Sequence, residues 1–361
     1  MADLKTVLDS REAITKLDKS NMLGSVEALH KQLTHAWEDT EKLSFTATAE
    51  IEEIVLAGMG GSALGADVIK HLYKDTLTVP FVIIREYTLP KYVGPQTLVI
   101  LASYSGTTEE VIAAAKEAIE KKAQIMVIAS GGTLIDMAKE HGWTYYQIEP
   151  THNPSGQPRM AIRYAVFGTI CLLSKAGLLS LTREEVDQVS ATIHKTVEAS
   201  AVEVPQDTNP AKLLAYSIFD KRPIYCVAGF LEGAGHVVAN QTNENAKAYA
   251  DYKVIPELNH HLMEGLRFPV SNKTTHVFVF LNSELYHTRS QARMKLTQQI
   301  VDENEIETMA LQLHSTTKLE QVFETIALVG FASFYLSMLE GIDPSPIPFV
   351  DKFKDELAKV K

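Results

Sequence analysis

Two turns constrain the fold of this chain more than any other feature. Each is rich in glycine or hydroxyl residues and lies between a short apolar run and a helical pattern. The first turn follows the apolar run 54–57 and holds Gly58, Gly60, Gly61 and Ser62. The second follows the apolar run 98–102 and holds Ser103, Ser105, Thr107 and Thr108. A strand that ends in such a turn before a helix is how a parallel α/β sheet presents donors to an anion. On neighbouring strands, the two turns would converge on one phosphate group.

The two turns offer different donors. Glycines dominate the first, so its backbone N–H groups can approach an anion closely. The second combines hydroxyl groups with the free N–H groups of the following helix, whose dipole favours negative charge. Taken alone, this second turn is equally well explained as a helix-capping box, because Thr107 and Glu110 have the S/T-x-x-E spacing. Its pairing with the glycine turn favours the anion site.

Nucleotide-binding fingerprints fit this chain poorly. Gly58, Gly60 and Ala63 loosely satisfy G-x-G-x-x-A, and Glu86 follows the next apolar run, but a hydroxyl turn has no place in a dinucleotide site. The sequence G-x-x-x-x-G-K-[ST] does not occur, so a P-loop is not supported. We therefore favour a sugar phosphate over a Rossmann cofactor, and expect no cofactor.

Composition and charge narrow the function classes. A chain of 361 residues with 45% hydrophobic content most naturally forms two domains. The net charge of −11 and the lack of a Lys/Arg block argue against a nucleic-acid partner or an anionic membrane. Cys171 and Cys226 stand in apolar runs, which indicates reduced thiols in a cytoplasmic protein. The N-terminus lacks the pattern of a signal peptide, and the longest apolar helix, around 326–339, is expected to be too short to span a bilayer.

The order of the patterns predicts an α/β protein with two doubly wound parallel sheets. Residues 1–48 have a helical pattern and would form an arm that packs on a neighbouring core. Helical patterns at 161–176 and 183–201 close the first half, and the proline-containing segment 204–210 is the expected linker. The expected strands of the first sheet are 54–57, 81–84, 98–102, 125–129 and 144–148.

The second half repeats this plan. The run 223–228 leads into a glycine turn and a helical pattern up to residue 248, and 275–281 is another expected strand. The likeness between the two strand–turn segments suggests an internal duplication. We expect an arm at 1–48, a first domain with the phosphate site at 49–203 and a second domain at 204–361. Because ligands bind at the carboxyl ends of such strands, the expected site is a cleft between the halves.

Three kinds of residue could carry chemistry. Glu244, in a polar stretch, is either a helix-end residue or a catalytic base. His260 and His261 are adjacent, so at most one faces a given site, and their spacing matches no recognised metal motif. No metal site is expected. Arg159 follows a proline at a helix start, where its guanidinium is either exposed or leans over a bound anion.

Taken together, these motifs resemble the bifunctional phosphoglucose/phosphomannose isomerases, which belong to the SIS (sugar isomerase) domain superfamily. The resemblance implies two SIS-type, flavodoxin-like subdomains, a homodimer and metal-free interconversion of glucose 6-phosphate and mannose 6-phosphate with fructose 6-phosphate. The segments that carry it, in chain order, are 18–22, 58–62, 103–110, 158–159, 243–247, 256–260 and 341–344.

The resemblance also implies a role for each residue. Glu244 would be the base, His260 the ring-opening acid, Arg159 the cation facing the enediolate, and Lys354 a substrate contact. His260 would reach the site from the partner subunit, so a monomer would be inactive. These groups suit proton transfer between C1 and C2, and the phosphate serves as a remote handle. The phosphate ligands would be Gly60, Gly61, Ser62, Ser103, Ser105 and Thr108.

Two segments beside the implied catalytic residues differ from the family pattern. The family usually has basic residues where this chain has 237–242, and Asn then Glu after Asn-His, where this chain has His261 and Leu262. Two further functions therefore stay open: a SIS-type regulator that binds a sugar phosphate without turning it over, and an isomerase of another phosphosugar. The sequence does not set the epimer preference, the dimer affinity or which of the two histidines faces the site.

Overall fold

The chain folds around two parallel β-sheets. The computed structural model describes residues 7–360. Within them, the first sheet has five parallel strands in the order β2-β1-β3-β4-β5, the flavodoxin-like order. The strands are β1 (Glu53–Gly58), β2 (Phe81–Ile84), β3 (Thr97–Ala102), β4 (Gln124–Ala129) and β5 (Thr144–Gln147). Each of the five predicted runs forms one of them, so the prediction for this sheet is confirmed.

The second sheet has four parallel strands in the described residues, in the order β7-β6-β8-β9. They are β6 (Arg222–Ala228), β7 (Asp251–Ile255), β8 (His276–Asn282) and β9 (Glu307–Gln312). The sequence predicted the buried strands β6 and β8 but missed β7 and β9. These two lie at the edges of the sheet and are mostly partly exposed, so they lack the continuous apolar run of a central strand.

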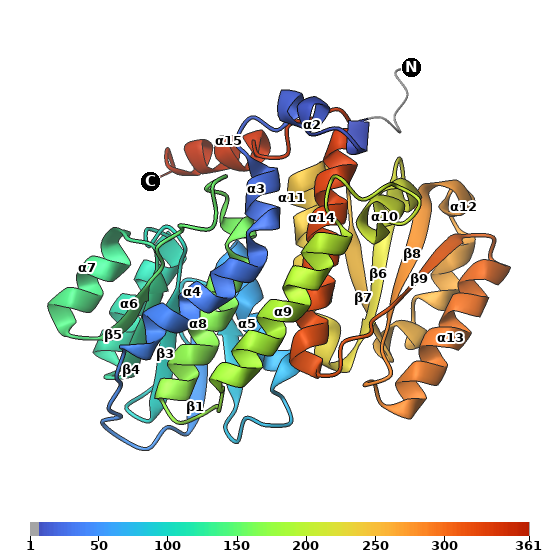
Figure 1. Ribbon diagram of the computed structural model, residues 1–361. Helices are drawn as coiled ribbons and strands as arrows, with labels where there is room; N and C mark the ends of the chain where they lie inside the picture. Colours follow the sequence, from blue (N-terminus) through green and yellow to red (C-terminus); the bar gives the residue numbers. More distant parts are fainter. Residues whose placement is uncertain (1–6, 361) are drawn as a thin grey trace.

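Helices fill the space between the two sheets and cover their outer faces (Figure 1). Side chains alternate along β1, so Ile54 and Leu56 join the core shared with the second half, whereas Val55 and Ala57 join a separate core under the outer helices. The α-helices of the first half are α2 (Arg11–Leu17), α3 (Met22–Glu27), α4 (Leu29–Glu41), α5 (Gly60–Leu72), α6 (Glu109–Glu120), α7 (Gly132–His141), α8 (Ile162–Lys175) and α9 (Arg183–Ala199). Those of the second half are α10 (Pro210–Ile218), α11 (Glu232–Ala246), α12 (Asn272–Thr275), α13 (Thr288–Glu303), α14 (Lys318–Leu339) and α15 (Pro348–Leu357). Short 3-10 helices are η1 (Pro158–Met160), η2 (Gly229–Leu231), η3 (Glu257–His260) and η4 (Met263–Arg267).

The long helix α14 runs through the middle of the molecule (Figure 1). Its 22 residues are long and apolar enough to cross a membrane, so the expectation that the longest apolar helix is too short was wrong. The sequence pattern hid its first turns because Lys318, Glu320 and Glu324 lie there. However, 89% of its apolar window is buried inside the protein, against α9, α10 and α11. Packing within the fold accounts for its apolar character.

The N-terminal helices form the predicted arm. α4 packs against α8 and α9, next to the first sheet. Residues 1–6 of the predicted arm lie outside the described residues. The domain boundaries after residues 48 and 203 fall in segments without helix or strand, and they stay predictions.

The second sheet meets the first with the opposite polarity. α11 starts at the carboxyl end of β6 and runs back along this strand. Gly235, near the start of α11, packs on Val227 near the end of β6. The hydroxyl of Thr242, near the end of α11, lies 2.9 Å from that of Tyr225, which is nearer the start of β6. The last turn of α11 is therefore at the amino end of the second sheet. This turn, and not the carboxyl ends of β6–β9, faces the glycine turn through the Arg159 segment, because Glu244 lies 3.5 Å from Arg159 and Pro158 adjoins Gly61. Of the expected cleft between the halves, the first sheet contributes the carboxyl ends of its strands, and the second half contributes the last turn of α11.

Candidate functional site

The glycine turn joins β1 to α5. Gly60 is the first residue of α5 and has a left-handed φ of 48°, a conformation that glycine adopts at little cost. The Ser62 hydroxyl accepts a hydrogen bond of 3.0 Å from the backbone N–H of Tyr104, in the second turn. Since β1 and β3 are neighbours and Gly58 pairs with Ala102, the two predicted turns lie side by side.

The hydroxyl turn joins β3 to α6 and forms a connected hydrogen-bond network. The buried Ser103 Oγ lies 2.7 Å from Thr108 Oγ1 and accepts from the N–H of Gly106 at 3.1 Å. The Ser105 Oγ accepts from the N–H and hydroxyl of Thr107. Thr108 is the N-cap of α6 and no side chain caps the helix, so the alternative of a Thr107–Glu110 capping box was wrong. The first N–H groups of α6 are left for another acceptor.

A third turn supports the second, and the sequence analysis missed it. Ser130, after β4, donates through its hydroxyl and its N–H to the carbonyl of Tyr104. Gly106 has a left-handed φ of 69°, and a Cβ there would lie 1.7 Å from the carbonyl oxygen of Gly131. The pair Gly131-Gly132 after an apolar run was the signal available in the sequence.

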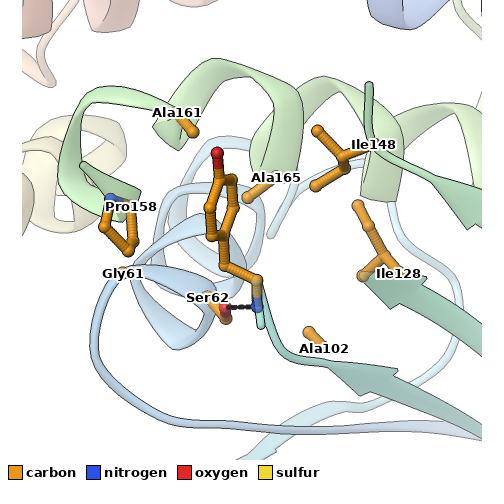
Figure 2. Close-up of a pocket in the computed structure, with 9 residues that line it drawn as sticks. Gly61, Ser62, Ala102, Ile128, Ile148, Pro158, Ala161 and Ala165 are labelled. Atoms are coloured by element: carbon orange, nitrogen blue, oxygen red, sulfur yellow. Dashed lines mark hydrogen bonds between the residues drawn. The ribbon is translucent and has the colours of Figure 1, made fainter. Parts of the chain in front are cut away.

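A small pocket lies beside the glycine turn and faces η1 (Figure 2). A Cβ on Gly61 would lie 3.7 Å from the carbonyl oxygen of Pro158, so the glycine turn is in close contact with the segment that carries Arg159. The residues that line the pocket are Gly61, Ser62, Ala102, Tyr104, Ile128, Ile148, Pro158, Ala161 and Ala165.

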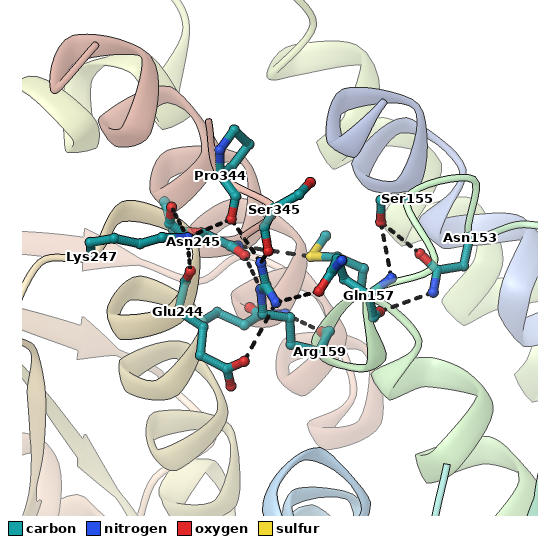
Figure 3. Close-up of polar contacts among 12 residues, drawn as sticks. Asn153, Ser155, Gln157, Arg159, Glu244, Asn245, Lys247, Pro344 and Ser345 are labelled. Carbon is teal, nitrogen blue, oxygen red and sulfur yellow. Dashed lines mark hydrogen bonds and ion pairs between the residues drawn. The ribbon is translucent and has the colours of Figure 1, made fainter. Parts of the chain in front are cut away.

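Arg159 is buried and held on almost every side (Figure 3). Its Nε donates to Asn245 Oδ1 at 2.7 Å, and its Nη2 donates to the carbonyl oxygens of Pro344 and Ser345. Its Nη1 donates to Gln157 Oε1 at 2.8 Å and lies 3.5 Å from the Glu244 carboxylate. Only Nη1 keeps a donor for Glu244 or a ligand, because a guanidinium has five N–H groups. The surface-arginine alternative was wrong.

Glu244 lies in the last turn of α11, facing Arg159. Burial raises the pKa of its carboxyl above the ordinary value, against the lowering effect of Arg159, Lys247 and Lys354. Lys247 has a left-handed φ of 55° and donates to the carbonyl oxygens of Glu244 and Pro344. Burial, aided by the charge of Arg159, lowers the pKa of Lys247 to about 8. A carboxylate whose pKa is shifted toward neutrality beside fixed cations is suited to proton transfer.

His260 lies far from this cluster in the same chain. It is the last residue of η3, which follows β7 at the carboxyl end of the second sheet, whereas Glu244 lies at the amino end. The 15 residues of α11 separate the two ends, which corresponds to about 22 Å. The His260 side chain is exposed and makes no hydrogen bond or ion pair within the described part of the chain. In contrast, His261 Nδ1 lies 3.1 Å from the carbonyl oxygen of Glu257. Of the two histidines, His260 is the one free to join another site.

Lys354 and the segment 237–242 complete the set of residues that the sequence analysis singled out near the site. Lys354 is exposed on α15, close enough to Glu244 to lower its pKa. Val237 and Val238 of α11 are buried in the core, and Gln241 donates to the carbonyl of Arg159, so the departure from basic residues here serves packing. Sequence reasoning gave no role to the supports of Arg159, namely Gln157, Asn245, Pro344 and Ser345, although Asn245 and Pro344 lie in segments it singled out. In the described residues, no group of three or more His, Cys, Asp or Glu could hold a metal ion.

Comparison with known proteins places this geometry in a family. Residues 49–158 match the family described as "SIS domain", and residues 207–357 match "Bacterial phospho-glucose isomerase C-terminal SIS domain". The bifunctional phosphoglucose/phosphomannose isomerase of Caldicellulosiruptor bescii is 32% identical over 343 residues, which are 94% of this chain and 100% of that protein. The protein of the same name from Aquifex aeolicus is 28% identical over 338 residues, which are 92% of this chain and 97% of that protein.

The fold agrees with this assignment. The crystal structure of a hypothetical protein from Thermus thermophilus superimposes with a TM-score of 0.75, covering 99% of this chain and 94% of that one. At 16% identity this likeness bears on the fold alone. The resemblance of the sequence motifs is confirmed by the identity to the curated relatives: the chain belongs to the bifunctional phosphoglucose/phosphomannose isomerase family.

Proposed function

We propose that this protein is an aldose–ketose isomerase that interconverts glucose 6-phosphate and mannose 6-phosphate with fructose 6-phosphate. The observation that carries the proposal is the pair formed by Glu244, with its raised carboxyl pKa, and the buried Arg159, next to two phosphate-type turns. A protein that only binds a sugar phosphate needs the turns but has no use for a carboxylate with a raised pKa. Glu244 therefore favours the enzyme over the regulator.

The proposed reaction starts with the phosphate group in the two turns. The N–H groups of Gly60 and Gly61 and the hydroxyls around Ser103 would hold it, and its two negative charges would be favoured by the amino ends of α5 and α6. Held in this way, the sugar chain lies over the end of α11, because the glycine turn contacts the Arg159 segment. The phosphate then serves as a handle that orients C1 and C2.

The proton transfer falls to Glu244. Its carboxylate would take the proton from C2 of the open-chain aldose and return it to C1, forming an enediolate between the two steps. Arg159 stabilises the negative charge on the enediolate oxygen, since its guanidinium is fixed by Asn245, Gln157 and the 344–345 carbonyls before substrate arrives. Bifunctionality requires that the proton be delivered to either face of C2.

Ring opening needs a group that titrates near neutral pH, and we assign it to His260 of the partner subunit. The distance between the two ends of α11 prevents His260 from serving Glu244 of its own chain. The active protein is therefore proposed to be a homodimer with shared sites. The buried, unpaired Cys171 and Cys226 support the proposal of a cytoplasmic protein. The reaction is proposed to need no metal ion.

The test is turnover by the purified protein in the presence of excess EDTA, followed by NMR from fructose 6-phosphate. Formation of both aldose phosphates is the expected result. Formation of one aldose alone would restrict the enzyme to one epimer. Saturable binding of fructose 6-phosphate without turnover would identify a regulator, and activity lost on chelation would overturn the metal-free mechanism.

A further inference from the structure

The C-terminal helix α15 leaves its apolar side largely exposed in the described chain. None of its residues is buried. Phe349 is 87% exposed and Phe353 is 64% exposed, and Val350 and Leu357 are exposed beside them. These positions fall on one side of a helix, given 3.6 residues per turn. We name them the α15 stripe.

Something must cover this stripe if α15 is to be a stable helix. A helix of 10 residues is marginal in water on its own, since isolated helices need about 12–15 residues even with favourable sequences. Large exposed apolar clusters on a protein surface mark interaction sites. The stripe therefore calls for a partner surface.

The position of α15 is set by the active site. Its first residue, Pro348, follows shortly after Ser345, whose carbonyl oxygen accepts from Arg159 at 3.0 Å. α15 lies at the same end of the molecule as α2 (Figure 1). A second subunit that brings His260 to this site must therefore pass close to α15.

A groove beside His260 has the matching character. It lies between the η3–η4 segment and α13, with a cavity volume of about 280 Å³. Met263, Leu296 and Ile300 supply its apolar surface, and Arg289 and Arg293 add positive charge. Its other lining residues are Asn259, Ala292 and Thr297.

This groove cannot be filled by α15 of the same chain. Asn259, in the groove, precedes His260 at the carboxyl end of the second sheet, whereas α15 starts beside Arg159 near its amino end. Charge does not select the partner, because Glu356, beside the α15 stripe, is paired with Lys359 of its own helix at 2.8 Å. The match between the two surfaces rests on the apolar side chains of the stripe and of the groove.

We propose that the α15 stripe of one subunit packs into the partner subunit's groove between η3–η4 and α13. The inference rests on the proposed function, because the shared site is what brings the two surfaces together. The contact would join the helix that carries Lys354 to the segment that carries the partner's His260. Docking of α15 would thus hold the ring-opening histidine at the site.

Engineered cysteines test this contact directly. Cys171 and Cys226 are buried, so a new surface cysteine is the reactive one. Full-length Phe353→Cys and Leu296→Cys proteins are made separately. They are then mixed, allowed to exchange subunits and oxidised with copper phenanthroline. The mixture should give a covalent dimer on a non-reducing gel at least tenfold above either variant alone. Mixing Phe353→Cys with Tyr92→Cys, an exposed position remote from the groove, is the matched control.

A second measurement does not depend on disulfide geometry. Phe349→Asp with Phe353→Asp should weaken the dimer at least tenfold in sedimentation velocity, with activity that recovers as protein concentration rises. Asp355→Asn, on the same helix away from the stripe, should leave both unchanged. Absence of the cross-link together with an unweakened dimer of the double variant would overturn the α15 contact. Isomerase activity in the unmodified protein tests the proposed function separately, so the two failures can be told apart.

Discussion

At the scale of single residues, the site depends on how Arg159 is fixed. Three of its nitrogens donate to Asn245, Gln157 and backbone carbonyls of residues 344 and 345, so the guanidinium does not need to reorganise when charge develops on the substrate. Glu244, in contrast, has only one side facing Arg159 and keeps a partly exposed carboxylate. A rigid cation beside a more open carboxylate is the arrangement expected for a fixed electrostatic stabiliser and a group that exchanges protons.

The first prediction concerns Glu244 as the base. Glu244→Gln keeps the size of the side chain but removes the proton acceptor, so kcat should fall by about 10²–10⁴-fold. The KM should change little, because the phosphate turns are untouched. Glu244→Asp, which keeps the charge with a shorter reach, should retain more activity than Glu244→Gln. Steady-state kinetics with fructose 6-phosphate measures both, and normal turnover of Glu244→Gln would remove this residue from the mechanism.

The second prediction concerns the pH dependence that Lys354 imposes. The base must be deprotonated to act, so activity falls as the pH drops through the pKa of Glu244, which burial places above its ordinary value. Lys354 lowers this pKa, so Lys354→Met should raise it and move the acidic limb to higher pH. Lys352→Met is the control, since Lys352 is exposed on the same helix. The shift between the two pH–kcat profiles is the measure, and identical profiles would place Lys354 away from the site.

At the scale of elements, the sequence predicted those strands that are buried and bounded by glycine, proline or serine. The five strands of the first sheet are short apolar runs bounded by glycine, proline or serine, and each was predicted. β7 and β9 were missed because polar residues such as Asp251, Lys253 and Glu307 interrupt their apolar runs, unlike in the edge strand β2. The support of the hydroxyl turn by Gly131 and Gly132 was missed because a glycine pair after an apolar run marks a turn but does not record which other backbone approaches it.

The third prediction tests the hydroxyl turn as the phosphate site. Ser103→Ala with Thr108→Ala removes two hydroxyls that lie 2.7 Å apart, while the helix α6 keeps its backbone. The KM for the sugar phosphate should rise about tenfold or more, with a smaller change in kcat, because these groups act on the remote phosphate. Thr133→Ala, at an exposed position at the start of α7, serves as the control. An unchanged KM in the double variant would contradict the assignment.

The fourth prediction separates two reasons for a glycine: a left-handed φ and the close approach of a neighbouring backbone. Gly106 and Gly142 both have a φ of 69°, but only Gly106 is crowded by a neighbouring backbone, that of Gly131. Gly142→Ala should cost about 1–2 kcal/mol for the left-handed conformation alone. Gly106→Ala should cost a further ~1–3 kcal/mol because the turns must move apart. Urea unfolding midpoints compare the two, and equal losses would mean that the turns are not tightly packed.

At the scale of the whole molecule, the chain places Glu244 and His260, which the proposed mechanism uses together, at two distant points. The sequence motifs identified both Glu244 and His260, but their separation could not be read from them. It depends on the second sheet packing with its polarity reversed. As a result, the end of α11 faces the Arg159 segment beside the glycine turn, while η3 lies at the other end of the second sheet. Relative polarity of two sheets is decided by packing of α5, α8, α11 and α14 between them, and no strand or helix signal encodes it.

The last prediction follows from this separation. Glu244→Gln and His260→Ala should each be nearly inactive, since each removes one member of every site. A heterodimer of the two would hold one site with an intact Glu244 from one chain and an intact His260 from the other. Random exchange in an equal mixture should restore about a quarter of the native activity, as expected for a two-fold dimer with one working site in half of the molecules. Refolding the two variants together, with each variant refolded alone as the control, gives the measurement; no recovery in a mixture that forms heterodimers would mean that each chain builds its site alone.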